Sequence, residues 1–284
     1  MSKLEIGLAW GTLQKASLLE LIEIAGRHGF TTLGLRPDVV LETVEAVGET
    51  GLRKRLADAR TRVRVIDAMT RGLAGQPAVD SPDPRLVGMP VGTPESCLRA
   101  AAAVEAPIIN ICYYAGPPTP RNALADAIGA YCAAVARHGL ELVVEPAVGT
   151  VAPTFGSVVE LFEAAGSPAN GGLLLDYWHL ARTDGTVADI EALPKGFIRA
   201  LQICDRIPPE PGAPYVPLTG RSLPGEGVLP TADFTRAVLA NRSPDQPAVT
   251  GELEVFSVEL RELPLDAAAA RIAEAVRAWG ATID

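Results

Sequence analysis

The chain has 284 residues, of which 48% are hydrophobic and 21% charged, a composition typical of a globular protein with a large core. Its formal net charge is -9, and no run of lysine and arginine is long enough to follow a phosphate backbone. We therefore expect no nucleic acid partner.

The cysteines and the amino-terminal segment indicate the cellular setting. The four cysteines are scattered and form no CxxC pair, which argues against a disulfide framework or a zinc knuckle and favours a reducing, cytoplasmic location. The first residues, MSKLEIGLAWGTLQ, lack the apolar run of a signal peptide. No stretch approaches the roughly 20 apolar residues needed to cross a bilayer, so we expect no membrane partner.

Eight short β-rich runs recur along the chain, and most are followed by an amphipathic stretch with helix signals. They span residues 4–10, 31–36, 62–68, 107–114, 140–145, 172–178, 198–205 and 247–256. Strands that alternate with helices favour a parallel sheet, because parallel neighbours need long crossover connections. Eight such units predict a (β/α)₈ TIM barrel, with residues 1–284 forming a single domain.

Helix boundary signals support this alternation. Residues 17–20 (SLLE) and 157–160 (SVVE) fit the capping box, in which a hydroxyl and a glutamate satisfy the first helical amides. Gly29 and Gly166 stand where a helix needs a left-handed final residue, and Pro94 suits a first helical position. The main competing fold is a doubly wound sheet. The first turn, GLAWGTLQ, lacks the G-x-G-x-x-G pattern that would favour it.

A segment rich in proline and glycine, residues 206–230, lies between the seventh predicted strand and its helix. In a barrel this segment belongs to the face at the carboxyl ends of the strands, where active sites are found. We expect it to form a lid or wall over the substrate. The alternative is an ordinary long surface loop.

Four consecutive predicted strands end in side chains that carry oxygen: Glu145, Asp176, Gln202 and Glu254. Taken singly, each could cap the next helix or pair with a basic neighbour. Three carboxylates that face one lumen repel each other unless a cation neutralises them, so their combination predicts one divalent metal ion. Oxygen ligands favour Mn²⁺, with Mg²⁺ or Co²⁺ as alternatives. Glu252 is a rival ligand, because it faces the same side of its strand as Glu254.

His179 follows Asp176 by three residues and is one of three histidines in the chain. Beside a metal, a neutral imidazole could bind a substrate hydroxyl or transfer a proton near neutral pH. The alternative is a histidine that only packs against the site.

The order of several motifs gives the chain a specific resemblance. These motifs are GLAWGTL, GLR, VVEP, LLLDYWH, LQICD, RSLPGEG and ELEVFS, spread over most of the sequence. Together they resemble the xylose isomerase-like TIM-barrel family, also called the sugar phosphate isomerase/epimerase superfamily. The endonuclease branch of that family relies on additional histidines and basic loops, which this chain lacks.

The resemblance implies roles for particular residues. Glu145, Asp176, Gln202 and Glu254 match the four metal-ligand positions of the family, and His179 matches its histidine after the strand-six aspartate. Many epimerases and isomerases of the family carry histidine where this chain has Gln202. That difference resembles the 3-dehydroshikimate dehydratase branch.

The resemblance also implies a metal-dependent sugar isomerase or epimerase that acts on a keto sugar or related polyhydroxy carbonyl compound through an enediolate. Glu145 and Glu254 would serve as base and acid. The alternative activity is a dehydratase, a lyase acting on a cyclic hydroxyketone of the 3-dehydroshikimate or inosose type. A barrel that binds a sugar without turnover is a third hypothesis.

Arginines and aromatic residues near the mouth are candidates for substrate contacts. Arg36 and Arg221 would bind a carboxylate or phosphate on the substrate, since the resemblance places both at the mouth, whereas Arg206 fits a solvated surface position equally well. Apolar walls for a sugar ring are expected from Trp10, Tyr113 and Trp178. The last helix or the proline-rich segment could mediate formation of a homo-oligomer.

Overall fold

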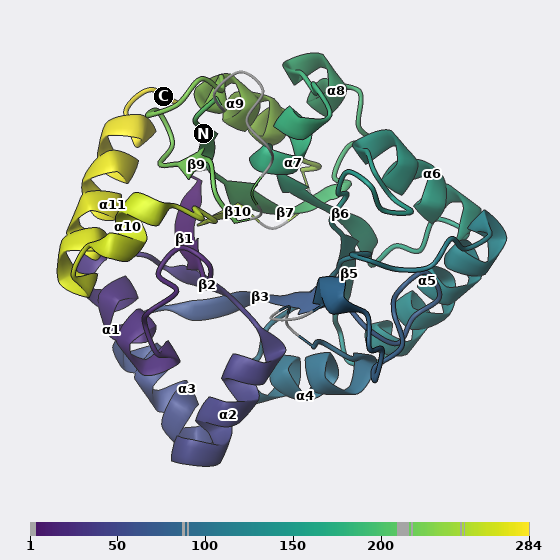
Figure 1. Cartoon of the computed structure of the whole chain (residues 1–284), viewed down its shortest axis with the longest axis horizontal. Coiled ribbons are helices and arrows are strands. Elements are labelled where there is room, and N and C mark those ends of the chain that lie inside the picture. Colours follow the sequence, from purple (N-terminus) through teal and green to yellow (C-terminus); the bar gives the residue numbers. More distant parts are fainter. Residues whose placement is uncertain are drawn as a thin grey trace.

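In the computed structural model, the described residues are 4–86, 89, 91–208, 216, 218–244, 246 and 248–283. Within them, eight parallel strands close into a barrel with the order β1-β10-β7-β6-β5-β4-β3-β2, and helices surround it (Figure 1). The parallel strands are β1 Glu5–Ala9, β2 Thr32–Leu35, β3 Arg62–Met69, β4 Ile108–Ile111, β5 Glu141–Val144, β6 Gly171–Asp176, β7 Ile198–Ile203 and β10 Thr250–Leu253. The predicted (β/α)₈ barrel is confirmed.

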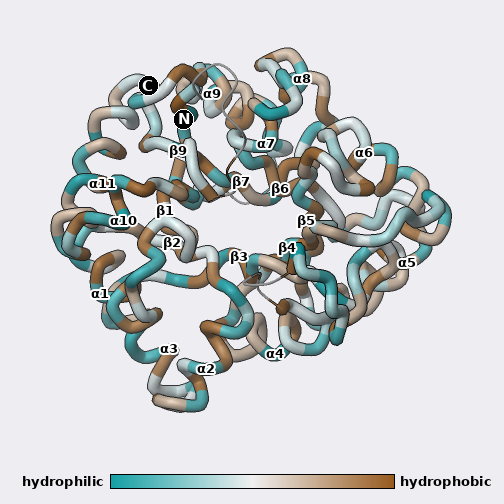
Figure 2. Tube along the Cα trace, in the orientation of Figure 1, coloured by the Kyte–Doolittle hydropathy of each residue, from teal (hydrophilic) through white to brown (hydrophobic). Residues whose placement is uncertain are grey.

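The outer layer consists of helices whose apolar faces pack on the strands. They are α1 Leu18–His28, α2 Pro37–Val47, α3 Glu49–Asp58, α4 Pro94–Val104, α5 Arg121–Ala136, α6 Phe155–Ala164, α7 Tyr177–Arg182, α8 Val187–Glu191, α9 Thr231–Asn241, α10 Val258–Glu262 and α11 Leu265–Gly280, with a 3₁₀ turn at Pro84–Leu86. Hydrophobic and hydrophilic residues alternate along these helices (Figure 2). Within the described residues, none of the helices has the length and apolar character to span a membrane.

The helix ends follow the local sequence. Ser17 and Glu20 form the predicted capping box of α1, and Gly29 ends that helix at φ 79°. The prediction for residues 157–160 was wrong, because α6 begins earlier. Thr154 is its N-cap, and Ser157 is the residue that reaches back to the cap amide. Both positions carry a small hydroxyl side chain, and Thr154 was not recognised as the cap.

Two predicted strand ends are shorter in the structure. Strand β6 ends at Asp176, and Tyr177 and Trp178 begin α7. Likewise, β7 ends at Ile203, and the next residues form a separate antiparallel pair of β8 (Asp205–Arg206) with β9 (Arg221–Ser222). This small hairpin stands at the base of the proline-rich segment and anchors it to the barrel.

The lumen of the barrel holds an apolar layer of its own. It is a separate cluster with one buried residue from each of the five strands β3 to β7: Val65, Ile108, Val143, Leu174 and Ala200. All five are at most 2% exposed. This layer closes the lumen beneath the carboxyl ends of these strands, so the lumen is a packed core and not a pore.

Candidate metal and active site

A layer of polar side chains stands directly on the apolar layer of the lumen. Each member follows an apolar residue of the same strand by two positions: Asp67, Asn110, Glu145, Asp176 and Gln202. Because side chains alternate with a period of two, the residue two positions on faces the same lumen. All five are buried, at no more than 6% exposure. The strands thus change from apolar to polar at one level of the barrel.

The four predicted metal-ligand residues lie in this layer or at its rim. They lie at or next to the carboxyl ends of the strands β5, β6, β7 and β10, which are neighbours in the barrel. Gln202 Nε2 lies 3.2 Å from Glu254 Oε1. Arg221 Nη1 joins Asp176 Oδ2, at 3.0 Å, to Glu254 Oε2, at 2.6 Å. The structure therefore brings the four side chains into one connected group around the lumen.

His179 completes the group on the β5 side. Its Nε2 lies 3.1 Å from Glu145 Oε1 and 3.8 Å from Asp176 Oδ2. The hydroxyl of Tyr114 lies 3.4 Å from the same nitrogen. This placement depends on Asp176, which accepts a hydrogen bond from Trp178 N at 2.8 Å and so caps the short helix α7 that carries His179. Asp176 therefore has both roles considered from the sequence, as a helix cap and as a lumen carboxylate.

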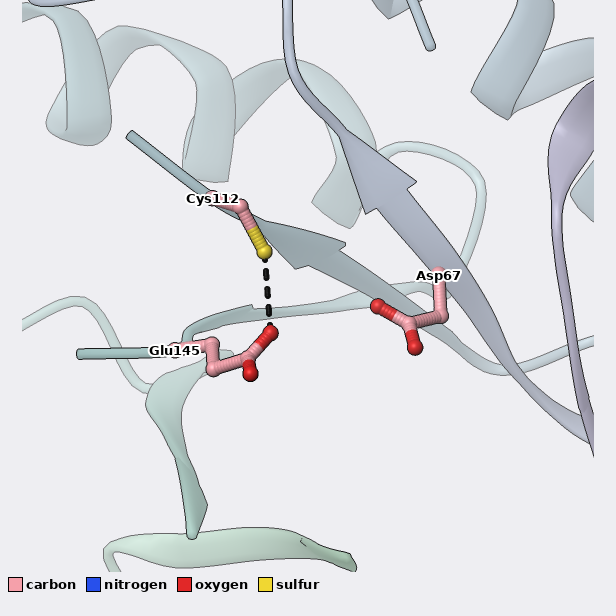
Figure 3. Close-up of side chains that lie close together, drawn as sticks. All are labelled: Asp67, Cys112 and Glu145. Carbon is pink, nitrogen blue, oxygen red and sulfur yellow. Dashed lines mark hydrogen bonds between the residues drawn. The ribbon is translucent and has the colours of Figure 1, made fainter. Parts of the chain in front are cut away.

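Sequence reasoning missed three residues on the β3 and β4 side of the lumen. Asn110 Nδ2 donates to Asp67 Oδ1 at 2.7 Å and to Glu145 Oε2 at 2.9 Å. Cys112 Sγ lies 2.9 Å from the same Glu145 oxygen, and Figure 3 shows Asp67 and Glu145 directed toward the space between them. Asp67 and Asn110 are polar residues inside apolar strands, at the lumen-facing positions of the period-two pattern. That pattern could have identified them.

The charges in the lumen are unbalanced. Among the described residues, the polar layer and its rim carry four carboxylates (Asp67, Glu145, Asp176 and Glu254) together with one guanidinium, that of Arg221, and with His179. Burial and the charge of Glu145 raise the pKa of Asp67 to about 7, against the hydrogen bonds from its two amide partners. Burial also raises the pKa of Glu254, although Arg221 opposes this. Burial acts the same way on Glu145, but the bonds and charge of His179 lower its pKa to about 2.

Several buried polar atoms of this layer have no hydrogen-bond partner among the described residues. They are Gln202 Oε1, Asn110 Oδ1 and His179 Nδ1. A buried carbonyl oxygen without a partner is costly unless something binds it. Gln202 Oε1 is such an oxygen, and the carboxylates of this layer outnumber its positive groups, so this donor set fits a divalent cation. Two groups place potential ligand atoms within 4.8 Å of one another: Glu145, Asp176 and His179, and also Asp67, Cys112 and Glu145.

Arg221 reaches the lumen from the proline-rich segment. Its guanidinium stacks on the rings of Phe256, at 4.8 Å, and Trp178, at 5.5 Å. Asp205, which is fully buried, holds the base of the segment by accepting bonds from the backbone N–H groups of Arg206, Gly225 and Leu229, at 2.7, 3.1 and 2.8 Å. The segment is thus an organised wall of the site where it is described. Residues 209–215 and 217 lie outside the described residues.

Arg36 and Trp10 lie together after β2 and β1, away from the hydrogen-bonded group. Arg36 forms an ion pair with Asp38 and stacks 4.8 Å from the Trp10 ring. Trp10 in turn packs edge-to-face on Phe256, whose ring also lies against the guanidinium of Arg221. An aromatic chain therefore connects the two predicted arginines along the mouth.

Three other predictions have different outcomes. The prediction for Tyr113 was wrong. Its buried ring lies beside Gly75 and Leu124, on the helix side of the strands, and it is Tyr114 that faces His179. Glu252 is buried one step deeper than Glu254, and among the described residues no hydrogen bond joins it to the group. Arg206 makes one long contact, 3.5 Å from Nη1 to the Ala181 carbonyl.

The fold and site together define an eight-stranded α/β barrel with a polar, carboxylate-rich centre at the carboxyl ends of its strands. Residues 19–278 match the family model described as "Xylose isomerase-like TIM barrel". The chain therefore belongs to the xylose isomerase-like TIM-barrel family. No curated protein shows significant sequence similarity to it.

Solved structures with the same fold cover almost the whole chain. The IolI protein, solved with a bound zinc atom, has 14% identity and a TM-score of 0.78, covering 98% of this chain and 99% of that one. D-psicose 3-epimerase, solved with D-fructose, has 14% identity and a TM-score of 0.72, covering 99% of both chains. The probable 3-DHS dehydratase AsbF from Bacillus anthracis has 16% identity and a TM-score of 0.69, covering 94% of this chain and 98% of that one. At these identities the likeness establishes the fold.

Proposed function

We propose that the chain is a divalent-metal-dependent enzyme that removes a proton next to the carbonyl of a polyhydroxy compound, as a sugar isomerase or epimerase. The observation that carries this proposal is the placement of Glu145 and Glu254. They directly follow β5 and β10, which are three positions apart around an eight-stranded barrel, so the two carboxyl groups lie on nearly opposite walls of one lumen. A substrate between them meets one carboxyl group on each face.

The metal would be held by Glu145, Asp176, Gln202 and Glu254. All four offer oxygen, which favours Mn²⁺, with Mg²⁺ or Co²⁺ as alternatives. When bound, such an ion acts as a Lewis acid on the substrate carbonyl and stabilises the negative charge of an enediolate. The support for this ligand set is the surplus of carboxylates and the unpartnered carbonyl oxygen of Gln202.

The protein side chains then supply the proton transfers. One carboxylate oxygen of Glu145 takes the proton from the carbon beside the carbonyl, and Glu254 returns a proton from the opposite wall, which inverts or relocates the stereocentre. His179 Nε2, 3.1 Å from Glu145 and 3.4 Å from the Tyr114 hydroxyl, is placed to hold a substrate hydroxyl. Arg36 and Arg221 bind a substrate anion, while Trp10 and Trp178 supply apolar walls. Arg221 approaches the lumen on the ring of Trp178, at 5.5 Å.

A dehydratase of a cyclic hydroxyketone is the second candidate, and Gln202 is the observation that favours it. An amide at the end of β7, in place of the histidine of many isomerases, fits the resemblance to the dehydratase branch. The first step would be the same removal of a proton by Glu145. A hydroxyl on the next carbon would then leave as water with a proton from His179, which forms a carbon–carbon double bond.

Solvent-deuterium exchange tests the shared first step. Protein shown to contain Mn²⁺ is incubated in D₂O with a panel of ketoses, and with 3-dehydroshikimate while protocatechuate absorbance is followed. We expect deuterium in a ketose next to its carbonyl, and Glu145→Gln should abolish this without unfolding the barrel. Rapid protocatechuate formation would establish the dehydratase instead. Exchange with no substrate by the metal-loaded protein would point to a sugar-binding barrel without turnover.

We infer that residues 1–284 act as one barrel domain on a small molecule in the cytoplasm, as a monomer or homo-oligomer.

A further inference from the structure

Asp67 is the point at which two amide side chains of the lumen meet. Its Oδ1 accepts from Asn110 Nδ2 at 2.7 Å, and its Oδ2 accepts from Gln202 Nε2 at 2.8 Å. These are its hydrogen bonds within the part of the chain that the structure describes. Asp67 is 6% exposed, so water does not replace these partners.

The carboxylates around each amide determine which way it points. Gln202 Nε2 lies between Asp67 Oδ2 and Glu254 Oε1, and Asn110 Nδ2 lies between Asp67 Oδ1 and Glu145 Oε2. A carbonyl oxygen at either place would face two carboxylate oxygens, which repel it. Both amides therefore direct their NH₂ groups toward Asp67. Their carbonyl oxygens point elsewhere and have no hydrogen-bond partner within the described residues.

We propose that Asp67 is a positioning residue of the metal site, which holds Gln202 with its carbonyl oxygen presented to the cation; this inference rests on the metal-dependent function proposed above. An amide binds a cation only through its oxygen, so the wrong orientation would place NH₂ against the metal. Glu145 and Glu254 are themselves ligands in that proposal. Asp67 is the carboxylate whose task is to orient the amides. Through Asn110 it is also linked to Glu145, so one residue of β3 organises ligands from β5 and β7.

The Cys112 side of the lumen is consistent with this role. Asp67, Cys112 and Glu145 lie close enough to form a metal-binding group, and Figure 3 shows them around one space. However, the NH₂ group of Asn110 donates to both Asp67 and Glu145. This shared NH₂ group links Asp67 to Glu145 by hydrogen bonds. The link is expected if Asp67 and Asn110 hold the proposed ligand Glu145 in place.

Asp67→Asn tests the inference, because it keeps the shape and removes one acceptor oxygen. Free Mn²⁺ is measured by electron paramagnetic resonance during titration of the metal-free protein. Loss of a group that orients a metal ligand typically weakens metal binding by about 10- to 100-fold, and we expect a loss in this range. Glu252→Gln is the matched control: it removes another buried lumen carboxylate that does not contact the amides, and it should leave affinity within about twofold of wild type.

Repeating Asp67→Asn in a Gln202→Glu variant separates the loss of amide orientation from the loss of the Asp67 charge. In Gln202→Glu, the ligand has two equivalent oxygens and needs no orientation. We therefore expect Asp67→Asn to weaken Mn²⁺ binding when position 202 is the native glutamine but not when it carries the Gln202→Glu substitution. An equal loss in both backgrounds, or no loss in either, would overturn the positioning role.

A metal-free readout distinguishes this inference from the proposed function. In nitrogen-15 NMR spectra of the apo protein, the side-chain NH₂ groups of Gln202 and Asn110 should each show a proton shifted downfield by its bond to Asp67. At least one of these signals should move upfield in Asp67→Asn. Unchanged amide signals would contradict the hydrogen bonds by which Asp67 orients the two amides. A wild-type protein that binds none of Mn²⁺, Mg²⁺, Co²⁺ or Zn²⁺ would instead refute the metal-dependent function, and with it the ligand role of Gln202.

Discussion

Arg221 donates to Glu254 twice, from Nη1 to the carboxylate at 2.6 Å and to the backbone carbonyl at 3.0 Å. Both residues are buried, and Asp176 shares the same nitrogen at 3.0 Å. Burial acts to lower the pKa of Arg221, but Asp176 and Glu254 raise it well above its ordinary value. A positive charge supplied by the wall segment therefore stabilises two of the proposed metal ligands.

Replacing this cation should destabilise the apo protein. Arg221→Met keeps much of the shape but leaves Asp176 and Glu254 without a cationic partner, which should lower the free energy of unfolding by about 3 kcal/mol in EDTA. Millimolar Mn²⁺ should restore more stability to the variant than it adds to wild type, because the metal replaces the lost charge. Urea denaturation with and without metal measures both effects. The same loss with and without Mn²⁺ would show that Arg221 contributes by packing alone.

Asp205 should control the position of the wall. Asp205→Asn leaves one acceptor oxygen for three backbone N–H donors, so we expect about 2 kcal/mol less stability and a raised KM, with the metal affinity nearly unchanged. Asp189→Asn is the control, because that carboxylate takes part in the exposed capping box at the start of α8 and holds no residue of the wall. A parallel change of KM in both variants would contradict the assigned role of Asp205.

Metal binding should itself stabilise the fold. At a free Mn²⁺ concentration of about 100 times Kd, linkage predicts about 2.7 kcal/mol of added stability. Gln202→Met removes one oxygen donor at similar size and also the amide bonds to Asp67 and Glu254, so its stability in EDTA should fall by about 1–3 kcal/mol while the further gain from Mn²⁺ becomes much smaller. Calorimetry in EDTA and in Mn²⁺ measures this difference. An undiminished gain would remove Gln202 from the ligand set.

Arg36 should affect substrate binding more than turnover. It lies at the mouth on the Trp10 ring, 4.8 Å from its centre, outside the hydrogen-bonded group. Loss of a charge-assisted bond to an anionic substrate corresponds to about a 10- to 100-fold higher KM for Arg36→Ala, with kcat changed little. Neutral substrates serve as the internal control. If KM rises equally for neutral and anionic substrates, the ion pair with Asp38 shapes the mouth and does not recognise charge.

The cysteines should resist modification in the native state. All four are buried and free. Burial raises the pKa of Cys97 and of Cys132 to about 12, so at pH 8 the reactive thiolate is scarcely populated. Ellman's reagent should therefore detect almost no thiol before denaturation and four after it. A fast-reacting thiol in the native protein would show that the structure around that cysteine opens readily to solvent.

The sequence predicted the architecture because the two periodicities are strong and local. Buried strands and amphipathic helices alternate along the chain, and parallel strands leave a barrel or a doubly wound sheet as the main choices. Glu145, Asp176 and Glu254 were proposed as ligands for the same reason, since they directly end or follow apolar strands, and Gln202 was proposed as the polar residue near the end of β7. The structure places them together, and His179 with them.

Residues inside strands were harder to assign to the site. Whether such a side chain faces the lumen or the helices depends on where the two-residue alternation begins. Asp67 lies within β3 and Asn110 within β4, so neither marks a strand end. Tyr113 was named as a wall residue without regard to its phase, yet Asn110 and Cys112 face the lumen, and the alternation sends Tyr113 outward and Tyr114 inward. The role of Arg221 in neutralising buried charge could not be read from local pattern, because its partners lie 33 and 45 residues away.

The apolar layer beneath the polar side chains also limits how molecules move through this protein. Val65, Ile108, Val143, Leu174 and Ala200 pack directly below the polar layer, so for the proposed function we expect small molecules to enter and leave at the carboxyl ends of the strands. Substrate and product would then pass Trp10, Arg36 and the segment that carries Arg221. We therefore expect the loops at this end of the barrel, and not the strands, to control the rates of substrate entry and product release.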